Sequence, residues 1–147
     1  MKAINRRASF DYELLERFEA GIALMGAEVK SVREGHVNLE GSFVKLTTHG
    51  AQLLNASILP YQYARPEGYD PKRTRNLLLH KKELLKIRQK MEGSNLTVVP
   101  VCLYTKGPRM KLEIALAKGK KQFEKRETIK KRQQKREMEQ QFRGKVK

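Results

Sequence analysis

Residues 10–24 read FDYELLERFEAGIAL, and this stretch decides the fold. Its even positions, from Phe10 to Leu24, are apolar or aromatic except for Glu16, whereas four of the five odd positions up to residue 19 are charged. A period of two predicts a strand with one buried face. A helix is the alternative, but it would bury Glu16 or leave Phe10 and Tyr12 outside the core. We therefore expect a long, half-buried strand here.

The rest of the chain alternates between strand and helix patterns. Apolar spacing and stop signals predict a helix over 25–34 that ends at Gly35 and a second helix over 81–91 that ends at Gly93. Between the helices, the pattern predicts a hairpin of strands 42–47 and 52–58 around His49-Gly50, a polar loop over 60–74 and a strand at 77–79. After the second helix, it predicts strands over 96–104 and 110–116, joined by a turn at 106–109.

The order of these elements indicates one fold class. The order is one strand, a helix, two or three strands, a second helix and two strands. A helix between the third and fourth barrel strands is the plan of an OB-fold. We therefore expect a mainly β protein, a closed antiparallel barrel of OB-fold type with two or three flanking helices. Pro100 lies inside a strand that is apolar on both faces, which predicts a bulge or an unpaired edge position.

The last thirty residues differ from the rest. Residues 118–147 hold 13 Lys or Arg and four Asp or Glu, with few apolar side chains. So charged a segment cannot bury enough surface to offset its ordering entropy. We expect a folded domain over 1–117 and a basic tail over 118–147 that is disordered alone. The tail favours helix once a polyanion neutralises it; a solvated tail that only aids solubility is the alternative.

Charge limits the choice of partners. The 147 residues carry a formal net charge of +16 with a pI of about 10.1, which favours a polyanion or an anionic membrane. No apolar run is long enough to span a bilayer, and the N-terminal segment does not resemble a secretory signal. The expected localisation is cytoplasmic, and no membrane partner is expected. The single cysteine, Cys102, excludes a disulfide framework and a cysteine-based zinc site.

Enzyme chemistry finds little support in the sequence. The three histidines, at 36, 49 and 80, are not at metal-ligand spacing, and Cys102 lies in an apolar strand where a core role is favoured. The carboxylates at 13, 16 and 19 form no acid–base arrangement. We therefore expect no enzyme, no metal and no cofactor.

Nucleic-acid binding is better supported. Basic residues gather at residues 5–7, at Lys72–Arg75 and along the tail, where they would neutralise phosphates. The tyrosines between Tyr61 and Tyr69 would either stack on exposed RNA bases or pack under their own loop, and the sequence leaves both options open.

Several separated motifs resemble one family, small protein B, the SsrA-binding proteins of bacteria. These motifs are NRRA at 5–8, FEAGIAL at 18–24, GAEVKS at 26–31, RTRNLLL at 73–79, IALAKGKK at 114–121 and FEKR at 123–126. The resemblance implies an OB-fold and a complex with the tRNA-like domain of transfer-messenger RNA. It also implies entry into ribosomes stalled on an mRNA without a stop codon. Alanyl-tRNA synthetase and elongation factor Tu would be indirect partners through that RNA.

The resemblance also implies RNA contacts at Asn5, Arg6, Arg7, Glu19, Arg73, Arg75 and Leu78, to which the basic cluster adds Lys72. The arginines would meet phosphates. Glu19 would accept hydrogen bonds from base amino groups or a 2′-hydroxyl, or else order a neighbouring arginine. Leu78 would contact a base or fill the core.

For the tail, the resemblance implies a helix in the decoding centre and the empty mRNA channel. The expected ribosome-contacting residues are Lys120, Lys121, Phe123, Glu124, Lys125, Arg126, Lys130, Lys131 and Arg132. Phe123 would stack on a decoding-centre base. The family often has Tyr or His at that position, so Phe123 keeps the aromatic face and lacks the polar tip, while Glu124 keeps the charge of the family's Asp.

Overall fold

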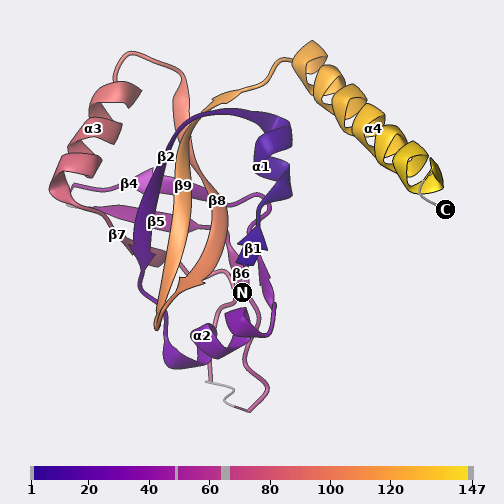
Figure 1. Cartoon of the computed structure of the whole chain (residues 1–147). Helices are drawn as coiled ribbons and strands as arrows, with labels where there is room; N and C mark the ends of the chain where they lie inside the picture. The colour runs from indigo at the N-terminus through magenta and orange to yellow at the C-terminus, as the bar shows by residue number, and fades with distance from the viewer. Residues whose placement is uncertain (1, 49, 64–66, 146–147) are drawn as a thin grey trace.

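The computed structural model of the chain describes residues 2–48, 50–63 and 67–145, apart from the side chains of 122, 123 and 141–145 (Figure 1). Its elements are β1 (Lys2–Ile4), α1 (Arg6–Asp11), β2 (Tyr12–Ile22), α2 (Gly26–Arg33), β3 (Val37–Asn38), β4 (Phe43–Leu46), β5 (Ala51–Leu54), β6 (Ser57–Ile58), β7 (Arg75–Leu78), α3 (Lys81–Met91), β8 (Leu96–Lys106), β9 (Arg109–Gly119) and α4 (Gln122–Lys145).

The strands pair into a ring. The main sheet runs β1-β8-β4-β5-β7-β2-β9, and β9 also pairs with β8, so the strands from β8 to β9 in this order close a ring, and β1 is added at β8. Every pairing is antiparallel. The mainly β, antiparallel character expected from the sequence is confirmed. Helices α1, α2 and α3 flank the ring, and α4 extends away from it (Figure 1).

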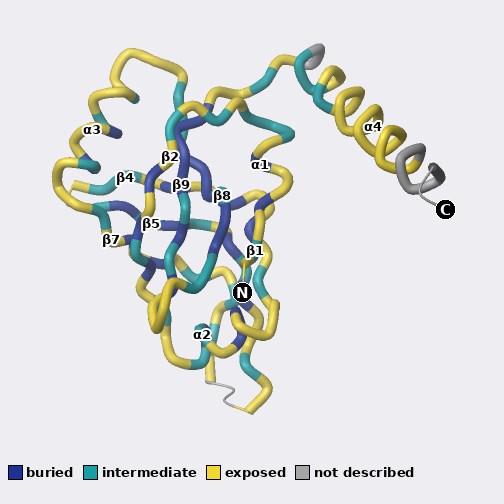
Figure 2. The backbone as a smooth tube through the Cα atoms, in the orientation of Figure 1, coloured by how far each residue is buried: buried dark blue, intermediate teal, exposed yellow. Residues whose placement is uncertain are grey.

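The core fills the inside of this ring. Phe18, Ala20 and Ile22 of β2 are buried, and they pack with Leu112 and Ile114 of β9 and with other strand residues. Their neighbours on β2 face outward, so the period of two is confirmed for this strand. Figure 2 shows the burial concentrated on the strands.

The predicted hairpin and the predicted bulge are both present. β4 and β5 pair from Phe43–Leu54 to Leu46–Ala51, although His49 of the turn lies outside the described residues. In β8 the register with β9 shifts between Pro100 and Cys102. The proline therefore sits at a bulge, where its missing N–H leaves no gap in the ladder.

The start of the long strand needs a correction. Phe10 and Asp11 belong to α1, and β2 begins only at Tyr12. Asn5 caps α1, because its Oδ1 accepts a hydrogen bond from the Ala8 N–H at 3.3 Å. This cap and the burial of Ala8 start a short helix that the alternating pattern conceals. Strands β1 and β3 are further additions to the expected order. The strand expected over 52–58 is divided into β5 and β6, with Asn55 between them at a φ of +63°.

The tail forms helix α4 in the structure. Every described residue from Lys130 to Gln140 is exposed, as the yellow trace in Figure 2 shows. Within the described residues, Lys125 and Arg132 of this helix contact α1, at Asp11 and Ser9. That the tail is disordered in the free protein stays a prediction. Within the described residues, no helix combines the length and the apolar character that crossing a membrane requires.

Candidate nucleic-acid interface

The predicted contact residues fall on three parts of the body and on the base of α4. Asn5, Arg6 and Arg7 begin α1, and Glu19 and Leu78 share an outer groove. Lys72, Arg73 and Arg75 lie along the segment that enters β7. The structure thus brings together Glu19 and Leu78, which are far apart in sequence.

Two arginines of α1 are exposed, whereas Asn5 is buried. The Asn5 amide nitrogen donates to the Pro100 carbonyl at 2.9 Å, and its backbone N–H donates to the Val101 carbonyl at 2.8 Å. Asn5 therefore fastens α1 to the bulge of β8. Arg7 pairs with Asp11 at 2.9 Å and lies 5.5 Å from the Phe10 ring, and Arg6 is exposed. Asn5 is thus a positioning residue, and the two arginines form the accessible cationic surface.

Glu19 and Leu78 line an open groove of about 520 Å³ across β2, β7 and β9. The Leu78 side chain is 67% exposed, so it does not fill the core. Gly21 lies beneath it, and a Cβ added there would come within 3.2 Å of the Leu78 Cβ. The other lining residues include His80, Arg109 and Lys111. An apolar side chain among polar and cationic groups suits contact with a base edge and its phosphates.

Glu19 is held as an anion at this groove. The Tyr104 hydroxyl donates to its carboxylate, and Lys106 Nζ lies 3.3 Å from Oε1. The Tyr104 hydrogen bond, aided by Lys106, lowers the pKa of Glu19 despite some desolvation. Burial, followed by the hydrogen bond to Glu19, raises the pKa of Tyr104. The sequence suggested that Glu19 either contacts RNA or orders a neighbouring arginine. In the structure its neighbours are Tyr104 and Lys106, and the contact with RNA stays a prediction.

Arg75 lies inside the protein. Its guanidinium pairs with Glu28 at 2.6 Å and donates to the carbonyls of Ala56 at 2.7 Å and Pro71 at 3.0 Å. The side chain is 0% exposed, and that of Glu28 is 1% exposed. A phosphate contact by Arg75 stays a prediction that this burial disfavours, because its donors already have protein acceptors.

Arg73 binds the second oxygen of the same carboxylate and keeps 32% of its side chain exposed. Burial alone would raise the pKa of Glu28, but hydrogen bonds from Arg73, the Met25 N–H and Arg75 outweigh it and lower that pKa. The buried ion pairs tie α2 to the segment before β7. Lys72 is exposed on this segment, where its N–H donates to Asp70 Oδ1 at 2.9 Å.

The base of α4 docks on α1. Arg132 donates to the Ser9 hydroxyl at 2.9 Å, Lys120 donates to the Ser9 carbonyl at 3.0 Å, and Lys125 lies 3.5 Å from Asp11. Glu124 accepts a hydrogen bond from the Lys121 N–H at 3.2 Å. The remaining predicted cations of the tail, Lys121, Arg126, Lys130 and Lys131, are exposed, and the side chain of Phe123 lies outside the described residues.

Four residues at or beside the groove were not predicted from the sequence: Arg109 and Lys111 line it, and Tyr104 and Lys106 contact Glu19. The sequence presents Lys106 and Arg109 only as members of the turn at 106–109, and Tyr104 and Lys111 only as strand positions. Register explains their position, because Gly21 pairs with Lys111 and Glu19 pairs with Glu113 across β2 and β9. Periodicity within one strand cannot reveal which residues of another strand lie beside it.

The described residues offer binding groups and no recognisable catalytic centre. Among them, no group of three or more His, Cys, Asp or Glu side chains is placed to hold a metal ion. Cys102 is buried, and this burial raises the pKa of its thiol, the opposite of what a nucleophilic cysteine requires.

Comparison with known proteins agrees with this geometry. A family model described as SmpB protein matches residues 2–144. The chain is 52% identical to the SsrA-binding protein of Sulfurihydrogenibium sp. (strain YO3AOP1), covering 99% of this chain and 95% of that protein. It is 45% identical to the SsrA-binding protein of Aquifex aeolicus (strain VF5), covering 98% of this chain and 92% of that protein. A solved structure described as "tmRNA-SmpB: a journey to the center of the bacterial ribosome" has a TM-score of 0.69 at 45% identity, over 82% of this chain and 85% of its own.

Proposed function

The chain belongs to the SmpB family, and from that premise we propose that it is a non-catalytic SsrA-binding protein of bacterial trans-translation. It binds the tRNA-like domain of transfer-messenger RNA and delivers this RNA to stalled ribosomes in the cytoplasm. Elongation factor Tu and alanyl-tRNA synthetase meet the protein only through the RNA. No cofactor takes part.

The observation that carries the proposal is the groove at Glu19 and Leu78. It combines an exposed leucine, the cations Arg109 and Lys111, and a carboxylate that Lys106 holds from beside the groove. Structured RNA offers matching groups in its unstacked bases, its 2′-hydroxyls and its phosphates. We propose that the ring of strands is an OB-type barrel and that this groove is its RNA face.

A second cationic surface supports the same function. Arg6 and Arg7 on α1 and Lys72 before β7 are exposed and would neutralise phosphates. Asn5 and Arg75 act as positioning residues, one for α1 and the other for the segment that carries Lys72 and Arg73.

We further propose a division at about residue 117. The folded part holds the transfer-messenger RNA, and the tail enters the decoding centre and the empty mRNA channel. The exposed cations of α4 suit ribosomal RNA phosphates, and its sparse contacts with the body suit a segment that changes partner.

Deletion of the residues after Lys121 tests this division. The truncated chain should bind transfer-messenger RNA within about twofold of the full chain and should fail to tag proteins on stalled ribosomes. A Leu78→Asp variant of the full chain should instead lose affinity for transfer-messenger RNA by roughly tenfold or more, because a charge replaces an apolar contact. If truncation abolished RNA binding, the division would be wrong. If neither chain bound this RNA, the proposed function would be wrong.

A further inference from the structure

We propose that a second pocket, between α1 and the turn before β4, receives one unpaired RNA base and prefers guanine. The pocket measures about 470 Å³ and lies apart from the groove at Glu19. This volume falls within the range of small-ligand sites and accommodates a nucleobase. The inference rests on the proposed function, because RNA is the ligand.

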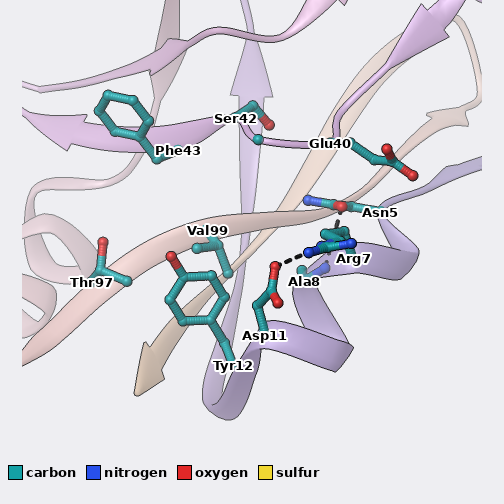
Figure 3. Close-up of a pocket in the computed structure, with 11 residues that line it drawn as sticks. Asn5, Arg7, Ala8, Asp11, Tyr12, Glu40, Ser42, Phe43, Thr97 and Val99 are labelled. Atoms are coloured by element: carbon teal, nitrogen blue, oxygen red, sulfur yellow. Dashed lines mark hydrogen bonds and ion pairs between the residues drawn. The ribbon is translucent and has the colours of Figure 1, made fainter. Parts of the chain in front are cut away.

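The walls of the pocket suit a flat ring (Figure 3). Tyr12 rises from the α1 side, and Phe43 belongs to the opposite side at the start of β4. Val99 of β8, which packs with Ala8 in a small second core, closes the apolar floor. Phe43 is 40% exposed, although large apolar side chains usually seek burial. Aromatic faces at an open site stack readily on bases.

A rigid turn presents Glu40 at the rim. Gly41 has a φ of +75°, and the Ser42 hydroxyl donates to the Leu39 carbonyl at 2.5 Å. The Glu40 N–H donates to Asn38 Oδ1 at 2.9 Å. These bonds fix the backbone that carries the Glu40 carboxylate. Within the described residues, that carboxylate has no recorded ion pair, although the chain is strongly basic.

The free carboxylate favours guanine over the other three bases. Guanine presents two adjacent donors, N1–H and N2–H₂, which match the two oxygens of one carboxylate. Adenine and cytosine each place an acceptor beside their amino group, and uracil flanks its N–H with two carbonyls. An acceptor facing Glu40 would repel it, so these bases lose part of the contact. Asp11 is less suited to this task, because Arg7 and Lys125 already occupy its oxygens.

The surroundings favour RNA over a protein ligand. An arginine of another protein would also suit Glu40, but Arg6 and Arg7 stand on α1 beside the pocket. Lys120, just before α4, and Arg132 of α4 contact the same helix. These cations repel a basic side chain and attract the phosphates on either side of a base.

Ultraviolet cross-linking of the full chain tests the inference. The protein is irradiated with transfer-messenger RNA in one arm and with small ribosomal subunits in the other, and tryptic adducts are identified by mass spectrometry. A guanosine adduct is expected on the peptide of residues 8–17, which contains Tyr12, or of residues 34–45, which contains Phe43. The arm that yields the adduct identifies the source of the base.

Three variants sharpen the test. Phe43→Leu should lower the adduct yield about tenfold, in line with stacking energies. Glu40→Gln should lower the guanine share of the adducts several-fold, because its amide group donates where the carboxylate accepts. Glu92→Gln, an exposed change outside the pocket, should behave as the wild type.

The contrary outcomes are distinct. If the wild type bound transfer-messenger RNA but gave no pocket adduct in either arm, this inference alone would be wrong. An unchanged base composition in Glu40→Gln would overturn the guanine preference. A cross-link between the pocket and a peptide of another protein would show that the ligand of the pocket is a protein and not RNA. Failure to retain transfer-messenger RNA at all would instead overturn the proposed function.

Discussion

In the ring of strands, alternate side chains such as Phe18, Ala20 and Ile22 are buried, whereas every described residue of α4 from Lys130 to Gln140 is exposed. Burial of apolar surface stabilises the ring and fixes its register. The described side chains of α4 bury no comparable apolar surface, so this part of the helix depends on local propensity and on its contacts with α1. The body can therefore recognise a fixed shape, while the tail can change its structure with its partner.

Hydrogen exchange should show the largest contrast between the two regions. Ile114 in β9 should exchange only through global unfolding, with protection on the order of 10⁴-fold or more for a domain of ordinary stability. Amides around Gln133 in α4 should be protected less than about tenfold in the free protein. Equal protection in both regions would show that the tail is a fixed part of the fold. Binding to small ribosomal subunits should raise the protection of α4 alone.

Replacing the buried arginine should give the next largest effect. Arg75→Ala removes the fully buried partner of Glu28 and should lower the free energy of unfolding by about 3–5 kcal/mol. Arg17→Ala is the matched control, because Arg17 pairs with Glu113 at 2.8 Å on the exposed face. The control substitution should lower the free energy of unfolding by less than about 1 kcal/mol. Urea unfolding measures both variants, and similar losses would contradict the role given to Arg75.

The Glu28 carboxylate should also make the stability of the body depend on pH. Hydrogen bonds from Arg73, the Met25 N–H and Arg75 outweigh burial and lower its folded pKa. The stabilisation is then fully present above the unfolded pKa of about 4.5 and is lost as the pH falls through the folded pKa. Urea unfolding at pH 7 and pH 3.5 should show a smaller change for Glu28→Gln than for the wild type. Glu92→Gln should follow the wild type, and a parallel pH dependence in Glu28→Gln would refute the assignment.

The smallest effect should come from the junction of the two regions. Ser9→Ala removes the hydroxyl that Arg132 contacts, and it should change the unfolding free energy by less than about 0.5 kcal/mol. It should nevertheless widen the range of α4 orientations, which small-angle X-ray scattering of the free protein would register as a larger radius of gyration. An unchanged scattering profile would mean that this contact does not direct the helix.

Periodicity predicted the parts of the fold in which one face is buried. The alternation in β2, the β4–β5 hairpin and the bulge at Pro100 all came from local patterns. Helix α1 was missed because its start depends on Asn5, whose amide also binds a carbonyl 95 positions away in sequence. Capping by a tertiary contact leaves no periodic signal.

The site was predictable to a smaller extent. Composition indicated a polyanion or an anionic membrane as the partner, and the motifs indicated Glu19 and Leu78. Only the strand register places these two residues beside Lys111. Arg75 shows the limit of reasoning from charge, because a basic cluster suggests exposure for all of its members. Its buried partner, Glu28, lies 47 positions earlier, on a helix that the sequence gives no reason to pair with it.

The burial of Cys102 has a practical consequence for following the tail on the ribosome. This thiol is the only one in the chain, it is 3% exposed, and its raised pKa keeps it protonated at neutral pH. Maleimide dyes should therefore not react with the native protein. A chain with Glu92→Cys and Gln133→Cys would accept a donor and an acceptor fluorophore at the two new thiols, without removal of the native one. Energy transfer between them would report the distance from the folded body to the tail in single molecules during binding to the ribosome.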